Sequence, residues 1–383
     1  MGALVAAVLA LATAPAAFGA GTIDGISDQN VPYWNGLFWH GGAPVSPFGQ
    51  FLAARAAGTA PGAQLHYARY VVAYDVMCDP SGPAFATFQA WLADVQQLGL
   101  QPVVGFWYGD FDGNRCPTLP KIPTTVAQYN GATAVAGFLA QFPSVRIVEP
   151  WNEPNDGSGP DVPAARAAAF WLAAHADCQP AGCPTVLGGD FSDAQTNLGS
   201  YEQKYVAALG GVDPIDWAIH PYHSTNYQTT APLTTFDSEL PSPTADRVWY
   251  TEVGAFYCTP KDNLKTGFTD TTLQQMQDAR ARYLVGTLMA PPFAPVHVFY
   301  YEFMYKNNIP GPCATDDSAL FAPTSTAPPL SFGPRLAAQE ILPAALAPPP
   351  VPSKAPPPPS NAIPFSGEPS WTVWADARTV PAG

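Results

Sequence analysis

Charged residues are scarce in this chain, and basic residues are the scarcer kind. Asp, Glu, Lys and Arg make up 12% of the 383 residues, and 16 Lys and Arg stand against 30 Asp and Glu, for a net charge of −14. Contacts with the phosphates of nucleic acid require clustered Lys and Arg. The charge balance therefore argues against a nucleic-acid partner.

Motifs of several enzyme and metal-binding classes are also missing. The sequence contains no phosphate-binding loop, no nucleophile-elbow serine and no His-Glu-x-x-His motif. It has no Cys-x-x-Cys pair and no paired spacing of histidines, which disfavours a metal site. We therefore expect no metal ion and no cofactor.

After the first 20 residues, no segment has 18 uninterrupted apolar residues, so the sequence predicts no membrane span. Residues 1–20 contain a short apolar run, Leu4 to Leu11, followed by small-residue triplets ending at Ala16 and Gly19 that suit cleavage. We expect this segment to be a signal peptide and the protein to be secreted or to lie at the cell surface.

The six cysteines form an even set, which fits an oxidising compartment. Two of them are close enough in sequence to close a small loop, and the other four each follow a predicted strand, where a disulfide can join neighbouring loops. We expect the pairs Cys78–Cys116, Cys178–Cys183 and Cys258–Cys313.

Between residues 21 and 342, short runs of β-branched and aromatic residues alternate with amphipathic stretches. The runs are mostly apolar throughout, as expected of parallel strands covered by helices. Eight of them predict a (β/α)₈ TIM barrel in the α/β class, which forms the catalytic domain. The predicted strands are 22–27, 66–73, 101–107, 145–151, 185–189, 216–220, 247–251 and 296–301, and the helices between them include 83–98, 126–142, 163–176, 198–209 and 271–289.

Proline is plentiful, with 45 residues, and many of them crowd the C-terminal end. Residues 343–364 predict an extended, solvated linker, because proline supplies no ladder hydrogen bonds. Residues 365–383 follow, and Trp371 to Trp374 alternate like a strand. This piece is too short for a domain, so we expect either a small β appendage or a truncated module.

Polar residues follow three of the predicted strands. Strand 145–151 runs into Asn152 and Glu153, strand 216–220 ends in His220 with Tyr222 close behind, and strand 247–251 runs into Glu252. In a parallel barrel the carboxyl ends of the strands meet at one mouth, where catalysis takes place. We therefore expect these side chains to face one mouth.

Two carboxylates from nearby strands are what glycoside hydrolysis requires. One stays protonated near neutral pH and donates to the leaving oxygen, while the other stays ionised and attacks the anomeric carbon. When the carboxyls lie ~5–5.5 Å apart, the reaction retains configuration and passes through a covalent glycosyl-enzyme. Glu153 and Glu252 are the candidates for this pair.

The motif Trp-Asn-Glu-Pro-Asn at 151–155, followed by Tyr-Thr-Glu-Val-Gly at 250–254, resembles clan A of the glycoside hydrolases. That clan comprises retaining barrel enzymes with the acid/base on strand four and the nucleophile on strand seven. The resemblance covers about residues 22–342 and implies that Glu153 is the acid/base and Glu252 the nucleophile. The first motif looks most like family 39, which includes β-xylosidases and related exopolysaccharide hydrolases, and families 5 and 30 are alternatives.

The same resemblance implies roles for further polar residues. Asn152 would hydrogen-bond the sugar 2-hydroxyl, and Tyr222 would donate to Glu252 beside its strand-six partner His220. Arg69 matches the clan's arginine, which would hold Glu252 ionised. The alternatives are a structural ion pair for Arg69 and a satisfied strand-end pair for His220 and Tyr222.

Aromatic residues are the candidates for sugar platforms, since the chain holds 10 Trp, 16 Tyr and 21 Phe. By the resemblance, Trp107 and either Trp34 or Trp39 could stack on sugar rings, with ordinary packing as the alternative. One departure is that residues 298–303 lack the Trp that commonly ends strand eight beneath the sugar. Tyr301 or Phe303 would then take its place.

Other carboxyls also end predicted strands. Glu302 is a third carboxyl near the mouth, and it could bind a sugar hydroxyl or pair with a cation. For Asp28, Asp110 and Asp190 loop capping is favoured over contact with sugar. We expect a monomer with a carbohydrate substrate, and the alternative function is a catalytically silent barrel that binds glycans.

Overall fold

A computed structural model describes residues 23–27, 38–39, 43–44, 47–59, 64–109, 116–156, 162–181, 185–259, 269–301, 318–323, 332–335 and 337–341. The predicted signal peptide (1–20), the linker (343–364) and the C-terminal piece (365–383) lie outside these residues. Among the described residues, no helix has the length and apolar character needed to cross a membrane.

The centre of the fold is a parallel sheet of nine strands in the order β7-β6-β5-β4-β1-β11-β10-β9-β8. Seven of the eight predicted ranges each contain one of these strands, and the range 185–189 contains β7 and the start of β8; no strand extends more than three residues beyond its range. The strands are β1 (Ile23–Ile26), β4 (Tyr67–Ala73), β5 (Gln101–Trp107), β6 (Ile147–Glu149), β7 (Thr185–Val186), β8 (Gly188–Ser192), β9 (Asp216–His220), β10 (Arg247–Val253) and β11 (His297–Tyr300).

The sheet closes into a barrel through an interrupted fifth strand. β7 pairs with β6, whereas β8 pairs with β9, and only Leu187 separates the two pieces. The backbone N–H of Leu187 donates to the carbonyl of Val148 at 2.9 Å, which keeps the junction beside β6. The predicted (β/α)₈ barrel is therefore confirmed, and the predicted single strand 185–189 is in fact two pieces.

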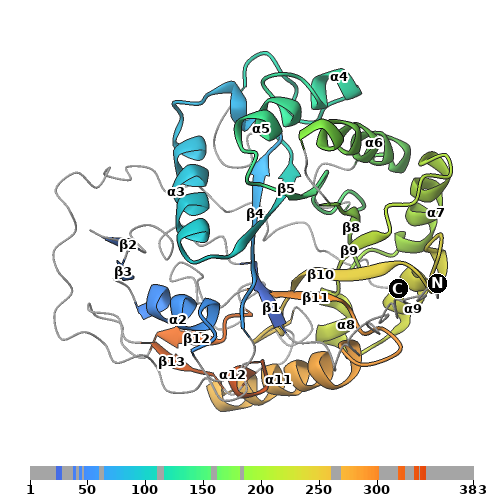
Figure 1. Cartoon of the computed structure of the whole chain (residues 1–383). Coiled ribbons are helices and arrows are strands. Elements are labelled where there is room, and N and C mark those ends of the chain that lie inside the picture. The colour runs from blue at the N-terminus through green and yellow to red at the C-terminus, as the bar shows by residue number, and fades with distance from the viewer. Residues whose placement is uncertain are drawn as a thin grey trace, which may run out of the picture.

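Helices surround the strands (Figure 1). The predicted helix 126–142 is wrong as one element, because Asn130 ends α4 and the carbonyl of Gly131 accepts from Ala134 and Gly137 in a turn before α5 begins. The helices of the barrel region are α2 (Pro47–Ala56), α3 (Pro83–Gln97), α4 (Val126–Tyr129), α5 (Val135–Gln141), α6 (Ala164–Ala181), α7 (Leu198–Ala208), α8 (Tyr222–Tyr227), α9 (Ala231–Glu239), α11 (Asp270–Tyr283), which continues into the π-helical turn η2 (Leu284–Leu288), and α12 (Ala337–Ile341).

Short elements lie outside the barrel sheet. β2 (Phe38–Trp39) pairs antiparallel with β3 (Ala43–Pro44), and β12 (Phe321–Pro323) pairs antiparallel with β13 (Phe332–Pro334). A 3-10 turn, η1 (Val76–Cys78), follows β4. The described residues therefore add only two small antiparallel pairs to the barrel.

Side chains fill the barrel in layers, because successive residues of a strand point to opposite faces. Gly25 leaves room for one of them, since a Cβ there would lie 2.5 Å from the Phe299 ring. Two residues further along several strands comes a second inward layer, and that layer is polar. The apolar layer consists of Val103, Ile147, Leu187, Ala218, Trp249 and Phe299, and the polar layer includes Arg69, Glu149, His220 and Thr251.

A disulfide joins Cys78, after β4, to Cys116, after β5, as the spacing predicts. Cys178 and Cys258 are also disulfide-bonded. Their expected partners, Cys183 and Cys313, lie outside the described residues. The first bridge ties together two loops that follow neighbouring strands.

Candidate active site

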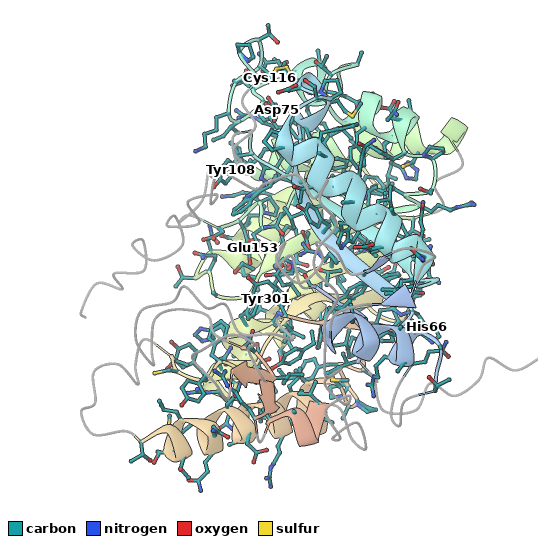
Figure 2. The ribbon with its side chains drawn as sticks, turned by 90° about the vertical axis from the view of Figure 1, so that its left-hand side faces the viewer. His66, Asp75, Tyr108, Cys116, Glu153 and Tyr301 are labelled. Atoms are coloured by element: carbon teal, nitrogen blue, oxygen red, sulfur yellow. A yellow bond between two sulfur atoms is a disulfide. The ribbon has the colours of Figure 1, made fainter. Side chains whose placement is uncertain are left out.

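The polar layer faces the end of the barrel where the strands terminate. Figure 2 shows Glu153, Tyr301 and Tyr108 along one side of the molecule, and His66, which precedes β4, toward the other. The mouth expected at the carboxyl ends of the strands is therefore where Glu153 lies.

Arg69 lies at the centre of this layer and is completely buried. Its Nε donates to Glu149 Oε2 at 2.7 Å, and its Nη1 donates to Glu252 Oε2 at 2.5 Å. Its Nη2 donates to Asn152 Oδ1 at 2.7 Å and to Asp190 Oδ2 at 3.1 Å. One guanidinium therefore joins side chains that follow or belong to three other strands.

Glu252 is held at both carboxyl oxygens. Oε2 accepts from Arg69, and Oε1 accepts from the hydroxyl of Tyr222 at 2.8 Å. Burial, together with the charge of Glu252, raises the pKa of Tyr222 well above its ordinary value, so the phenol keeps its proton and donates. The side chain of Glu252 is 16% exposed, so it is open to the mouth while fixed in orientation.

Glu153 follows β6 in a loop with unusual backbone geometry. Its φ is +45°, a conformation that non-glycine residues adopt only where the surrounding structure enforces it. The backbone N–H of Glu153 donates to the carbonyl of Asp190 at 2.9 Å, and its Oε1 lies 3.0 Å from Nδ1 of His220. Two reciprocal hydrogen bonds of 2.8 Å between Asn155 and Ser192 tie the same loop to β8.

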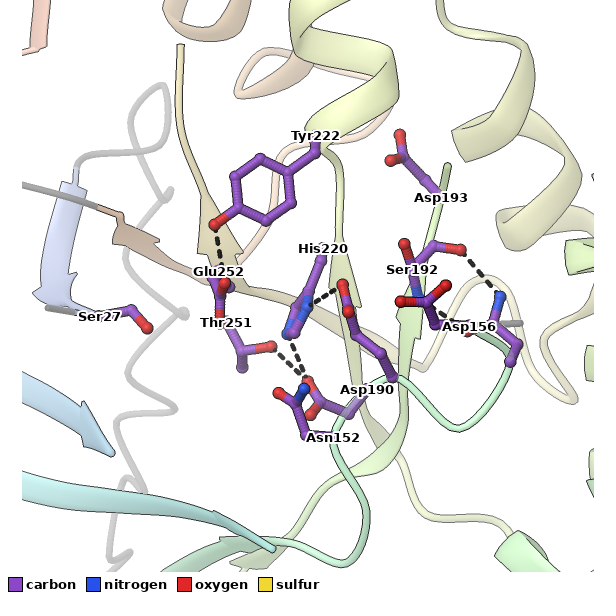
Figure 3. A network of polar contacts seen from close by, with 12 residues as sticks. Ser27, Asn152, Asp156, Asp190, Ser192, Asp193, His220, Tyr222, Thr251 and Glu252 are labelled. Atoms are coloured by element: carbon purple, nitrogen blue, oxygen red, sulfur yellow. Dashed lines mark hydrogen bonds and ion pairs between the residues drawn. The ribbon is translucent and has the colours of Figure 1, made fainter. Parts of the chain in front are cut away.

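His220 contacts a carboxyl group at each ring nitrogen. Nδ1 faces Glu153, and Nε2 lies 2.8 Å from Asp190 Oδ1. Burial alone would lower the pKa of His220, but the carboxylate of Asp190 and the contact with Glu153 raise it well above its ordinary value. Burial would raise the pKa of Asp190, yet His220 and Arg69 lower it. A buried, hydrogen-bonded pair therefore joins His220 to Asp190 (Figure 3).

Glu149 is the second carboxyl that is completely buried beside Arg69. Burial raises the pKa of Glu149 to about 8, although Arg69 opposes the shift. A Cβ at Gly105 would lie 2.7 Å from Glu149 Oε2, so this glycine makes room for the pair on the neighbouring strand. Glu149 therefore holds its proton more readily than an ordinary glutamate, while Arg69 also pairs with Asp190 and Glu252.

The structure brings six of the predicted site residues together, namely Asn152, Glu153, His220, Tyr222, Arg69 and Glu252. Tyr301 is partly exposed, and its ring meets the Tyr222 ring edge-on at 6.2 Å. Trp107 is only 4% exposed and packs against Tyr108, so little of its surface is open to a sugar. Trp39 belongs to β2, and Trp34, Glu302 and Phe303 lie outside the described residues.

The sequence did not predict the buried contacts of Asp190, Glu149 and Thr251. Asp190 does not simply cap a loop, because its carboxylate accepts from His220, Thr251 and Arg69. Glu149 could have been found from the sequence, since a carboxyl inside an otherwise apolar strand needs a buried cation. The sequence gives no such signal for Asp190, because its side chain points into the barrel only through a shift in the pairing of β8 with β9.

Neither a protein-family model nor a curated protein sequence matches the chain. Among solved structures, fungal β-1,4-galactanases are similar in fold, with 13% identity, coverage of 79% of this chain and 95% of theirs, and a TM-score of 0.51. A family 39 glycoside hydrolase from Bacteroides cellulosilyticus WH2 is 20% identical, with 72% of this chain and 57% of that one covered and a TM-score of 0.46. A family 5 glycoside hydrolase from Prevotella bryantii B14 is 12% identical, with coverage of 74% and 89% and a TM-score of 0.44. The chain thus spans little more than half the length of the family 39 enzyme, and the galactanase likeness supports the barrel fold.

Proposed function

We propose that the protein is a retaining glycoside hydrolase in which Glu252 is the nucleophile and Glu153 the acid/base. The observation that carries the proposal is the different environment of the two carboxyls. Glu252 is fixed by a guanidinium and a phenol, which stabilise an ionised carboxylate. Glu153 faces an imidazole nitrogen, with which it can exchange a proton.

The reaction would proceed in two displacements. In the first, a Glu252 oxygen forms a bond to the anomeric carbon, and the bond to the leaving oxygen breaks as Glu153 gives that oxygen its proton. In the second, the Glu153 carboxylate removes a proton from water, the water oxygen bonds to the anomeric carbon, and the bond to Glu252 breaks. Each residue ends in the state in which it began.

Asn152 supports sugar recognition in this proposal. Its Oδ1 accepts from Arg69, which directs the amide NH₂ group away from the arginine. That group would donate to the sugar 2-hydroxyl, a hydrogen bond that strengthens as positive charge develops on the ring. Tyr301, which lies beside Tyr222, would supply aromatic surface in place of the missing Trp.

We further propose that the protein acts outside the cell, with residues 1–20 as its signal peptide. The disulfide between Cys78 and Cys116 supports an oxidising location, because such bonds persist mainly in exported proteins. The substrate would be a poly- or oligosaccharide, and the galactanase-like fold makes β-1,4-galactan one substrate to include in a test.

The test is a panel of aryl β-galactosides, glucosides and xylosides together with β-1,4-galactan, xylan and β-glucans. NMR would record the anomer released first. We expect hydrolysis with retained configuration, and loss of activity in Glu153→Gln toward glycans. Asp94→Asn, which changes a partly buried carboxyl on the outer helix α3, is the control and should keep wild-type activity. Release of the inverted anomer, or binding without hydrolysis, would contradict the proposal.

A further inference from the structure

Asp190 occupies an irregular position in the fifth barrel strand. The pairing of β8 with β9 shifts between Gly189 and Phe191, and the φ of Asp190 is +60°. Leu187 points into the barrel, so regular alternation would also point Phe191 inward, yet Phe191 packs against Tyr205 of the outer helix α7. The bulge therefore turns Asp190 inward in place of its neighbour.

The carboxylate of Asp190 is completely buried and is hydrogen-bonded at both oxygens. Oδ1 lies 2.8 Å from His220 Nε2 and accepts from Thr251 Oγ1 at 2.9 Å, while Oδ2 accepts from Arg69 at 3.1 Å. The backbone carbonyl of the same residue accepts the N–H of Glu153. Asp190 thus contacts the arginine beside Glu252 as well as the histidine and the backbone beside Glu153.

These contacts determine which ring nitrogen His220 presents to Glu153. Arg69 Nη2 also lies 3.3 Å from His220 Nε2, but its two N–H bonds are already donated to Asn152 and Asp190. Nε2 therefore donates its proton to Asp190, and only Nδ1 remains for the contact with Glu153 Oε1. The proton between Nδ1 and Oε1 is bonded to one of the two groups. When it is bonded to Glu153, the carboxyl donates to the ring; when it is bonded to His220, the ring donates to the carboxylate. The ring can rotate away from this arrangement only by breaking its contact with Asp190.

We propose that Asp190 is a positioning residue for the acid/base half of the reaction, acting on Glu153 through the ring of His220 and through its own backbone carbonyl. This inference rests on the proposed function. Asp190 does not bind sugar directly, since no part of it is exposed.

Asp190→Asn is the variant that tests this role. Asparagine tolerates a positive φ at least as well as aspartate, so the strand geometry can be kept. Its amide, however, keeps only one acceptor oxygen, so the NH₂ group faces another donor, either Arg69 Nη2 or His220 Nε2–H. The permanent charge of Arg69 favours turning the oxygen toward the guanidinium, and the ring then has to change its tautomer or its orientation. Proton transfer by a positioned side chain contributes about 10²–10⁴-fold, so we expect hydrolysis of unactivated glycans to fall by about 100-fold.

The discriminating measurement uses 2,4-dinitrophenyl glycosides of the best sugar with and without sodium azide. Dinitrophenolate leaves without acid assistance, so a defect at Glu153 slows only the second displacement, which needs a base. Azide attacks the glycosyl-enzyme without a base. We expect Asp190→Asn to show a burst of dinitrophenolate followed by slow turnover, and azide to restore turnover and yield a glycosyl azide.

Glu149→Gln is the matched comparison, because Glu149 contacts Arg69 and not His220 among the described contacts. This variant should affect Glu252 through Arg69 and leave Glu153 unchanged, so azide should not restore its turnover. Glu153→Ala serves as the reference, and its rescue by azide tests the proposed function independently of Asp190. If Glu153→Ala were rescued and Asp190→Asn were slow but not rescued, or were as active as wild type, the positioning role would be overturned while the proposed function stood.

Thr251→Val covers the case in which Asp190→Asn does not fold. It removes one donor to Asp190 Oδ1 and keeps the shape of the side chain. We expect a smaller loss of turnover that azide also restores. An activity loss without azide rescue, or no loss, would contradict the inference.

Discussion

Tyr222 donates a hydrogen bond of 2.8 Å to Oε1 of Glu252, and the other oxygen of that carboxylate faces Arg69. The Tyr222 ring stacks on Phe256 at a centroid distance of 5.3 Å, which fixes the direction of its hydroxyl. The proposed nucleophile, Glu252, is therefore oriented by a phenol that is itself held by packing.

Tyr222→Phe keeps the stacking and removes the hydroxyl. A hydrogen bond to a charged group contributes about 1.5–3 kcal/mol, so we expect kcat/KM for aryl glycosides to fall about 10- to 100-fold. The melting temperature should change little. Steady-state kinetics and thermal unfolding of the same preparation check both statements, and equal kinetics in variant and wild type would exclude the orienting role.

Arg69→Met should strongly destabilise the fold. The change leaves the carboxyls of Asp190 and Glu252 without their buried cation, and breaking a buried ion pair costs about 3–5 kcal/mol. Because Glu149 has a raised pKa and keeps its proton more readily, we expect Glu149→Gln to be the milder variant. Urea unfolding measures the free energy of unfolding of both variants. If Glu149→Gln were the less stable of the two, Arg69 would not be the cation that stabilises Asp190 and Glu252.

Glu202 on α7 provides a test of pH-dependent stability away from the site. It is completely buried, and neither carboxyl oxygen has a hydrogen-bond partner among the described residues. Burial, with the charges of Glu239 and Asp237, raises the pKa of Glu202 from 4.5 to about 10. Between these values the folded protein keeps a proton that the unfolded chain releases, so stability falls as pH rises, by up to ~1.4 kcal/mol per pH unit.

Glu202→Gln should remove this contribution. We expect the free energy of unfolding of wild type to decline more steeply than that of the variant between pH 5 and pH 8. Urea titrations at intervals of one pH unit provide the measurement. Parallel curves for the two proteins would show that Glu202 is ionised in the folded state.

The barrel and the positions of Glu153 and Glu252 at its mouth could be predicted from the sequence because both follow from regular structure. Strands such as Gln101–Trp107 and Asp216–His220 have mostly apolar interiors and clear ends. Glu153 and His220 then lie at the mouth, because parallel strands bring their carboxyl ends together.

What the sequence did not predict depends on local departures from regular structure. A bulge turns Asp190 inward, against the alternation that Leu187 and Phe191 would follow. A turn at Gly131 divides the predicted helix 126–142. Such irregularities are decided by tertiary contacts, and residue periodicity does not report them.

In the proposed mechanism Glu252 becomes covalently bonded to the sugar. The direct measurement is incubation of the active enzyme with a 2-deoxy-2-fluoroglycosyl fluoride, followed by proteolysis and mass spectrometry of the labelled peptide. The fluorine slows both displacements, and the fluoride leaving group lets the first one proceed, so the intermediate accumulates. We predict one added fluorosugar on Glu252 and none in Glu252→Gln, whereas a label on another residue, or persistent labelling of Glu252→Gln, would contradict the account.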